Sequence, residues 1–332
     1  MKDVIAEAID RLLAEQCPPD TVAKIEGGQS AETLWSRFEE TGFLDAMVTE
    51  ELGGFGLGLT DVSELIRLTG KYAVPLPLAE TVIVRGLLGS RGLKPPSGAI
   101  AIAGTLERRD AYLTCDMAIA CTHSRWVLGR CDGESRLLQD GELGRRSPLS
   151  SLDAPIRWTI QQWHEAPSLG TQFDLTSIHA SVRALQLCGA MATVLDRSLA
   201  YANERQQFGR PIGKFQAIQH DLAIMAEHAS AARMAAELAA RQDGLRFDRL
   251  KIAVAKARAS EAAVEIAALA HSVHGAIGFS REYPLQLWTR RLHAWRQAAG
   301  SEAYWHDVLG LALLESAGPS LDLLRTLTDL AA

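Results

Sequence analysis

Cysteine is scarce in the sequence, and its few occurrences form no pattern. Cys17, Cys115, Cys121, Cys131 and Cys188 are scattered and odd in number, and no C-x-x-C pair or regular Cys/His spacing joins them. A disulfide framework and a zinc site both require recognisable ligand spacings, so the sequence predicts neither. We therefore expect reduced thiols, as in cytoplasmic proteins, and no bound metal.

Positive charge and long apolar runs are also lacking. The formal net charge of the 332 residues is -6, which argues against a nucleic-acid-binding surface. No apolar run approaches the roughly 18 residues that a membrane span needs, so we expect no membrane span. The first residues, MKDVIAEAIDRLLAEQ, place acidic side chains within a helical period and are not typical of a secretory signal. These features predict a soluble, cytoplasmic protein.

Three zones of different composition divide the chain. Residues 1–94 carry apolar side chains at helical spacing and predict an N-terminal helical domain. Residues 95–172 consist of short apolar segments separated by Gly, Asp, Ser and Pro, which predicts a small, reduced β-domain. Residues 173–332 contain long Ala-rich helical stretches and predict a C-terminal four-helix bundle. The expected fold class is α+β and multidomain.

Individual segments in the last two zones can be assigned to strands and helices. The segments of strand length in the middle zone are 99–104, 117–121, 125–130, 135–140 and 156–163. The helices expected for the bundle run over 174–205, 215–242, 247–273 and much of 285–316.

The connection between the first two bundle helices holds the most informative motif. It reads Y-A-x-E-R-x-x-F-G-x-P-I over 201–212, so Arg205 and Phe208 lie three residues apart directly after a helix. Surface turns are usually built from small polar residues. Taken alone, Arg205 is most simply a solvated cation that the dipole of the preceding helix favours.

Three motifs together resemble those of the acyl-CoA dehydrogenase family, over essentially the whole chain. Residues 201–223, Y-A-x-E-R-x-x-F-G-x-P-I-x-x-F-Q-A-I-Q-H-x-L-A, resemble the family's central signature almost position for position. H-G-A-I-G-F-S-R-E-Y-P-L at 274–285 resembles its second signature, and G-F-x-x-A-M-V-T-E-E-L-G-G-F-G at 42–56 is similar to its N-terminal helix–turn. The resemblance implies FAD as cofactor, an acyl-CoA thioester as substrate, and the same three-domain fold.

The resemblance also implies which residues contact the flavin. Arg205 would reach the diphosphate of a flavin held by a neighbouring subunit, since a guanidinium pairs bidentately with phosphate oxygens and keeps its charge. Phe208 would pack against the adenine end of the same flavin. The other flavin-facing positions that the resemblance implies are Gln207, Ser272, Gly275 and Ala276.

The catalytic position departs from the family pattern. The family's Glu-Gly-Thr/Ser motif falls on Ala299-Gly300-Ser301, and a methyl group cannot accept the α-proton of the substrate. Two substitutes are open. His179 matches the position where some relatives carry the base, and its ordinary pKa suits proton transfer. Glu302 should lie on the same helix as Ala299, one turn beyond it, which is too far for attack.

The middle zone and the second signature also depart from the family. Neither the Thr/Ser-Glu-Pro-x-(Ala/Gly)-Gly-Ser-Asp segment nor the Trp-Ile-Thr/Ser-Asn segment of active members is present between residues 95 and 170. Ser272 stands where the family often has Gln. Ala276 stands where it usually has Gly, and its methyl group would crowd a close cofactor.

These departures are similar to those of the short, base-lacking partner in bacterial heterotetrameric acyl-CoA dehydrogenases of the steroid-CoA type. That resemblance implies a hetero-oligomer in which a longer subunit carries the catalytic Glu, with activity only in the presence of that partner. Two other hypotheses stay open. One is a self-sufficient dehydrogenase with a displaced base, and the other is a flavin-free scaffold or acyl-CoA-binding protein.

Overall fold

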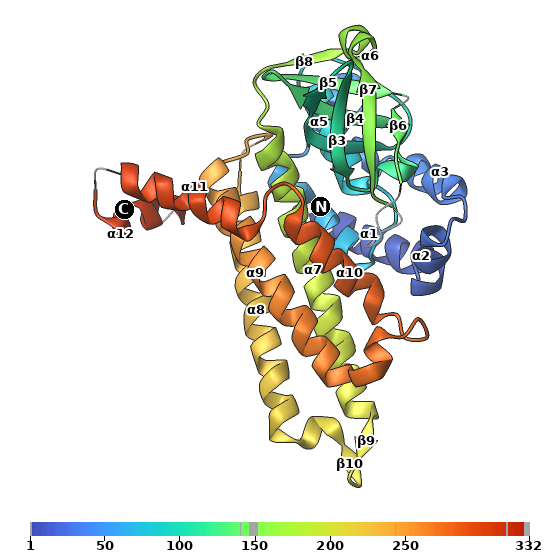
Figure 1. The fold of residues 1–332 in the computed structure, drawn as a ribbon, viewed down its shortest axis with the longest axis vertical. Helices are drawn as coiled ribbons and strands as arrows, with labels where there is room; N and C mark the ends of the chain where they lie inside the picture. Colours follow the sequence, from blue (N-terminus) through green and yellow to red (C-terminus); the bar gives the residue numbers. More distant parts are fainter. Residues whose placement is uncertain (1, 140, 146–151, 243, 317, 329–332) are drawn as a thin grey trace.

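The computed structural model describes residues 2–328 except 140, 146–151, 243 and 317. Its elements follow one another as a group of helices, a group of strands and a second group of helices (Figure 1). The expected α+β multidomain class is therefore confirmed. The domain bounds 1–94, 95–172 and 173–332 stay predictions.

The first group of helices surrounds a helix that is buried along its whole length. This helix, α5, is apolar on nearly every side, as expected for a helix inside a core. The elements of the group are α1 (Lys2–Gln16), α2 (Pro19–Glu26), α3 (Glu32–Glu40), η1 (Phe43–Asp45), η2 (Glu50–Leu52), α4 (Leu59–Lys71) and α5 (Leu78–Gly89).

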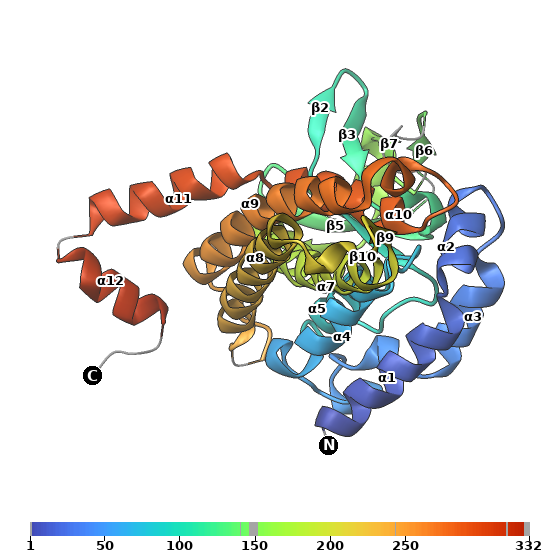
Figure 2. The same cartoon turned by 90° about the horizontal axis from the view of Figure 1, so that it is seen from below.

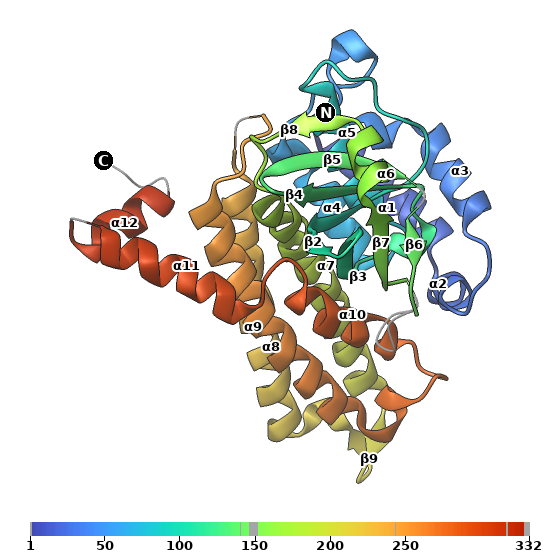
Figure 3. The same cartoon turned by 45° about the horizontal axis from the view of Figure 1, so that its top comes forward.

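Two small sheets pack face to face above the helices (Figure 3). One has the order β1-β4-β5-β8, in which β1 and β4 are parallel, and the other has the order β2-β3-β7-β6. Trp158 and Trp163 are buried in the core between them. The strands are β1 (Ile100–Thr105), β2 (Glu107–Arg109), β3 (Tyr112–Ala118), β4 (Trp126–Cys131), β5 (Glu134–Gln139), β6 (Glu142–Leu143), β7 (Ala154–Thr159) and β8 (Ser168–Gly170).

Two of the expected strands are wrong in part. The segment 117–121 contains only the end of β3, because the chain turns at Ala120, whose φ is 55° and left-handed, and enters the short helix η3 (Cys121–His123). The segment 156–163 leaves the sheet after Thr159, whose hydroxyl accepts a hydrogen bond from Gln162 N at 3.1 Å and caps α6 (Ile160–Glu165). Residue 140 of the segment 135–140 lies outside the described residues.

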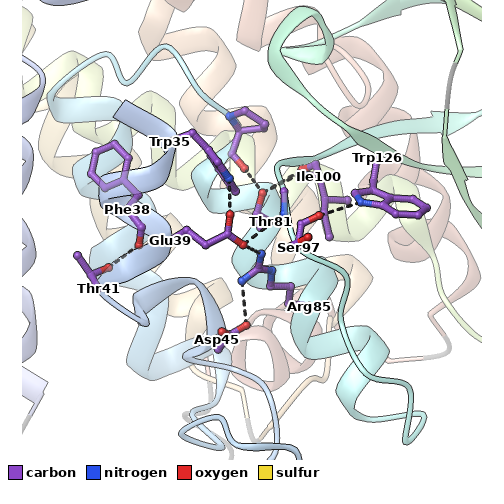
Figure 4. Close-up of polar contacts among 12 residues, drawn as sticks. Trp35, Phe38, Glu39, Thr41, Asp45, Thr81, Arg85, Ser97, Ile100 and Trp126 are labelled. Atoms are coloured by element: carbon purple, nitrogen blue, oxygen red, sulfur yellow. Dashed lines mark hydrogen bonds and ion pairs between the residues drawn. The ribbon is translucent and has the colours of Figure 1, made fainter. Parts of the chain in front are cut away.

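An arginine from α5 fixes the strands to the N-terminal helices (Figure 4). The buried Arg85 donates to Glu39 Oε1 at 2.5 Å and to Asp45 Oδ1 at 3.0 Å. Glu39 Oε1 also accepts from the backbone N–H of Gly98, at 3.2 Å, just before β1. The Thr81 hydroxyl on α5 accepts from Ile100 N at 2.9 Å, so α5 and β1 form one rigid unit.

The last group of helices forms the expected bundle around α7. Its members are α7 (Leu175–Glu204), α8 (Gln216–Ala240), α9 (Arg249–His274) and α10 (Leu285–Gln297). Close backbone contact joins α7 to α4, because a Cβ on Gly189 would lie 1.9 Å from the carbonyl oxygen of Arg67. Only glycine fits there, so the first and last groups of helices share one core.

The fourth bundle helix is shorter than expected. A single helix over much of 285–316 is wrong, since the chain forms α10 and then α11 (Glu302–Glu315), with a turn between them. Ala299 and Gly300 in this turn have φ of 56° and 93°, which an α-helix excludes. Figures 1 to 3 show α11 and α12 (Ser320–Leu327) extending away from the bundle as an arm.

The longest helices are more apolar than the sequence analysis expected. The helix 175–204 and the segment 249–279 are long and apolar enough to cross a membrane, both with mean hydropathy 1.3, so the expectation that no stretch approaches that length is wrong. In α7, 83% of the apolar window is buried inside the protein, as in the core helix of a bundle.

Candidate functional site

The motif that follows α7 forms a small hairpin that projects from the far end of the bundle. Strands β9 (Gln206–Gln207) and β10 (Arg210–Pro211) pair there, and η4 (Ile212–Lys214) leads into α8. Phe208 and Gly209 at the tip have φ of 51° and 78°, as in a type I′ turn. The phenyl side chain is nonetheless 92% exposed. An aromatic residue held in water on a strained backbone indicates a surface that meets something outside the chain.

Arg205 stands at the base of this hairpin. Its backbone N–H donates to Tyr201 O at 2.8 Å, and its carbonyl oxygen accepts from Ile212 N at 2.8 Å, so the main chain is fixed on both sides. The side chain is exposed, and no carboxylate pairs with its guanidinium among the residues that the structure describes. A fixed backbone with an unpaired guanidinium suits the binding of an external anion. Gln207 is exposed beside it.

An aromatic stack brings the second motif to the same end of the bundle. The rings of Tyr201 on α7 and His274 on α9 are stacked with centroids 4.6 Å apart. Ser272 lies in the last turn of α9, Gly275 and Ala276 begin η5 (Gly275–Phe279), and all three are exposed. The structure therefore places the six residues that the resemblance assigns to a flavin at the same end of the bundle.

A second location lies between the strands and the bundle. It is a cleft of about 540 Å³ with walls from β1, β3, α7, α10 and the start of α11. Both His179 and Ala299 line this cleft, so the structure brings the two family base positions together. The other lining residues include Met117, Ile119 and Thr176, and none of the described lining residues is Lys, Arg, Asp or Glu.

The turn that carries Ala299 is held by a buried lysine, which the sequence analysis missed. Lys256 on α9 is fully buried, and its Nζ donates to the carbonyl oxygens of Arg296 and Gly300, both at 2.8 Å. A third bond runs to the hydroxyl of Ser260 at 2.9 Å, so every ammonium proton has an acceptor. Burial lowers the pKa of Lys256 to about 7.

His179 is neutral in its surroundings. The side chain is buried, and its Nε2 accepts a hydrogen bond from Arg183 Nε at 3.0 Å. Burial, followed by the positive charges of Arg183 and Lys256, holds the pKa of His179 well below its ordinary value. Arg183 in turn pairs with Glu80 at 2.5 Å in a buried ion pair.

Glu302 is not where the sequence analysis placed it. The assumption that Ala299 and Glu302 share a helix is wrong, because α11 begins at Glu302 after the left-handed turn. Its carboxylate forms an ion pair with Arg296. Burial alone raises the pKa of Glu302, but hydrogen bonds from its own backbone and from Arg296 keep it below the ordinary value. It is absent from the described lining of the cleft.

The hairpin and the cleft are far apart (Figure 1). His179 and Arg205 are 26 residues apart along α7, which at 1.5 Å per residue corresponds to about 39 Å. This separation exceeds the diameter of a small domain. The residues at the hairpin therefore cannot serve a ligand in the cleft of their own chain.

The two locations differ in how well they fit the flavin that the resemblance implies. At the hairpin, the exposed guanidinium of Arg205 fits a diphosphate, and the exposed ring of Phe208 fits a flat aromatic base. In the cleft, the middle zone contributes Met117, Ile119 and residues 103–105 to the described lining. None of the described lining residues is a cation that could balance a diphosphate. The hairpin end fits part of a flavin nucleotide, whereas the cleft does not fit a whole one.

Known proteins resemble the chain over most of its length. Residues 178–314 match the family model described as the C-terminal domain of acyl-CoA dehydrogenase. Acyl-CoA dehydrogenase IpdE2 of Mycolicibacterium smegmatis is 27% identical over 307 residues, which cover 90% of this chain and 94% of that protein. The solved ChsE4-ChsE5 complex from Mycobacterium tuberculosis has a TM-score of 0.79 at 17% identity, covering 96% of this chain and 98% of its own. A variant of the steroid ACAD Tcur3481-Tcur3483 has a TM-score of 0.80 at 21% identity, covering 95% and 98%.

Proposed function

We propose that this chain, whose residues 178–314 match the C-terminal domain of acyl-CoA dehydrogenase, is the base-lacking subunit of a heteromeric, FAD-dependent acyl-CoA dehydrogenase. A longer subunit of the same family would hold most of the FAD and carry the catalytic Glu. The observation that supports this most strongly is the separation of about 39 Å between Arg205 and the chain's own cleft. Residues that bind flavin but lie too far from the cleft of their own chain can contact only a flavin that another chain holds, which requires an assembly.

The chemistry would be divided between the two chains. When bound, FAD accepts a hydride from the β-carbon of an acyl-CoA thioester. This chain would contribute Arg205 to the diphosphate and Phe208 to the adenine end, with Gln207 beside them. The partner's Glu would take the α-proton, because Ala299 here cannot.

The names of the related proteins favour a steroid-derived substrate and two different subunits. One similar structure is a steroid ACAD, and another is a complex of two chains, ChsE4 and ChsE5. We propose by analogy a CoA ester of a steroid-derived acid as the substrate of the assembly. The five buried, unpaired cysteines agree with a cytoplasmic location.

The two alternatives have less support. For a self-sufficient enzyme with a displaced base, the engaged Nε2 of His179 and the ion pair of Glu302 with Arg296 both weigh against proton abstraction. For a flavin-free scaffold or acyl-CoA-binding protein, the exposed Arg205 and Phe208 would have no role.

Co-expression tests the proposal. The chain would be purified alone and together with a longer acyl-CoA dehydrogenase encoded beside its gene, and flavin absorbance and dye reduction by an acyl-CoA would be measured. We expect the chain alone to be colourless and inactive and the complex to be yellow and active. In the complex, Arg205→Ala should lower the flavin content, whereas Lys214→Ala, which removes an exposed charge from the same end, should not. Yellow colour and full turnover from the chain alone would overturn the proposal.

A further inference from the structure

A chain of buried polar contacts leads from α5 to the wall of the cleft. It begins at Glu80, whose carboxylate pairs with Arg183 on α7, and both side chains are only 1% exposed. Arg183 Nη1 also donates to Gln186 Oε1 at 2.6 Å, and Gln186 Nε2 donates to the hydroxyl of Thr69 at 3.0 Å. The guanidinium of Arg183 is therefore held on two sides by α5 and α7.

This arrangement determines which nitrogen of His179 carries the proton. Arg183 Nε–H donates to His179 Nε2, and a guanidinium keeps its protons at every pH that proteins experience. Nε2 must therefore be an acceptor, and the single proton of the neutral ring is on Nδ1. A second proton is disfavoured, because burial and the neighbouring charges of Arg183 on α7 and Lys256 on α9 lower the pKa of the ring.

We propose that His179 is a fixed hydrogen-bond donor of the cleft, not a base, and that its Nδ1–H binds a carbonyl or hydroxyl oxygen of an uncharged, apolar ligand. His179 lines the cleft, and Nδ1–H has no acceptor within the described part of the chain. It is thus the only polar group that this side chain has left for a ligand. The inference goes beyond the proposed function, since it concerns this chain's own cleft and does not depend on a partner or on flavin.

The rest of the lining determines the ligand class. Met117, Ile119 and the alanines of α10 and its following turn make most of the described wall apolar. Without a cation or carboxylate in that wall, a charged group would lose its hydration and gain no partner. The hydroxyl of Thr176, one turn before His179 on α7, is a further neutral polar group, and Thr105, Gln297 and Tyr304 add three more. An apolar ring system with one oxygen acceptor satisfies these conditions.

Nitrogen-15 NMR of the full-length chain tests the tautomer directly. The chain would be labelled at its nine histidines, and His179 would be assigned from the signals lost in His179→Gln. We expect the proton on Nδ1, with no titration between about pH 5 and 8. A proton on Nε2, or a titration near the ordinary histidine pKa, would overturn the proposal, and neither result would bear on the heteromeric assembly.

Ligand binding tests the second half of the inference. The probes would be the bicyclic ketone 2-decalone and its hydrocarbon analogue decalin, with dissociation constants measured by NMR. We expect the ketone to bind roughly fivefold more tightly than decalin to the wild type. His179→Phe should abolish this difference, whereas His179→Asn should keep it, because the amide N–H replaces Nδ1–H. Thr326→Val, which removes an exposed hydroxyl outside the lining, should leave it unchanged.

Three results would contradict the ligand class. They are equal affinity of ketone and hydrocarbon for the wild type, a difference that persists in His179→Phe, and failure of both probes to bind at their solubility limits. Thermal melting of each variant shows whether it is folded. If His179→Phe does not fold, the comparison between the wild type and His179→Asn decides.

Discussion

Lys256 Nζ lies 2.8 Å from the carbonyl oxygen of Gly300, so the first third of α9 holds the turn that presents Ala299 to the cleft. Trp305 supports the same turn from α11, because its Nε1 donates to Ala299 O at 3.0 Å. The turn thus keeps a defined shape although the side chain of Ala299 is only a methyl group. This rigidity makes substitutions at the turn informative.

Restoring a carboxylate to the turn should not restore activity. We expect Ala299→Glu to give the chain alone no acyl-CoA oxidation, because a base without a flavin beside it has no hydride acceptor. The turnover of the assembled complex should stay at its wild-type value, since we propose that the reaction takes place in the partner's site. Dye-coupled oxidation of an acyl-CoA measures both. Turnover by the isolated variant would show that the cleft of this chain binds flavin after all.

Removing the buried ammonium should destabilise the protein. Lys256→Met leaves the carbonyl oxygens of Arg296 and Gly300 without a donor, and we expect the free energy of unfolding to fall by roughly 2 to 4 kcal/mol near neutral pH. Urea unfolding measures the change. The exposed Lys214→Met serves as the control and should have little effect.

The same variant makes a prediction about pH. The pKa of Lys256 is about 7 in the folded protein, and that of a lysine in an unfolded chain is about 10.4. Between these values the unfolded state binds more protons, so the stability of the wild type relative to Lys256→Met should rise with pH across this window. A stability difference that stays constant from pH 7 to 10 would mean that the buried amine does not titrate there.

Two glycine-to-alanine changes should have opposite effects. A Cβ on Gly189 would lie 1.9 Å from the backbone of α4, so we expect Gly189→Ala to cost about 3 kcal/mol or more. Gly310 lies within α11 with open space around it, and Gly310→Ala should stabilise the protein by about 0.5 to 1 kcal/mol. Denaturant unfolding of both variants measures the contrast. Similar effects would refute the close contact between α4 and α7.

Phe208 should matter for flavin and not for folding. Its ring is 92% exposed and its φ is 51°, so Phe208→Gly gives up little buried area and relieves backbone strain. We expect no fall in the melting temperature of the free chain, together with a roughly tenfold weaker retention of flavin by the complex, as for a lost stacking contact. Phe55→Gly removes another exposed ring and should leave flavin retention unchanged. A loss of melting temperature in Phe208→Gly would assign the ring a structural role instead.

The sequence predicts the elements that depend on local pattern and misses those that depend on long-range contacts. Helical periodicity and the Gly-Pro stop after Arg205 predict α7 almost to the residue. The break between α10 and α11 was missed, because Ala299 adopts a left-handed φ only through bonds from Lys256 and Trp305 on other helices. A lysine in the middle of an Ala-rich stripe, four residues before Ser260, was the available signal.

The two functional locations were predictable to different degrees. The motifs at 201–212 and 272–276 are separated by two long helices, and antiparallel packing of such helices returns both motifs to one end. The sequence does not predict that Arg183 donates to His179 and so determines which ring nitrogen carries the proton. Arg183 stands one turn after His179, but only the buried Glu80 from α5 explains why it turns inward.

The length of α7 has an evolutionary consequence. The cleft and the hairpin lie about 39 Å apart along one helix, so a substitution at one location should have little effect on the other. Under the proposed function, residues near Ala299 could diverge toward new ligands while the hairpin keeps its role toward a neighbouring chain. A duplicated gene with this architecture is able to explore a second role without first losing its original one.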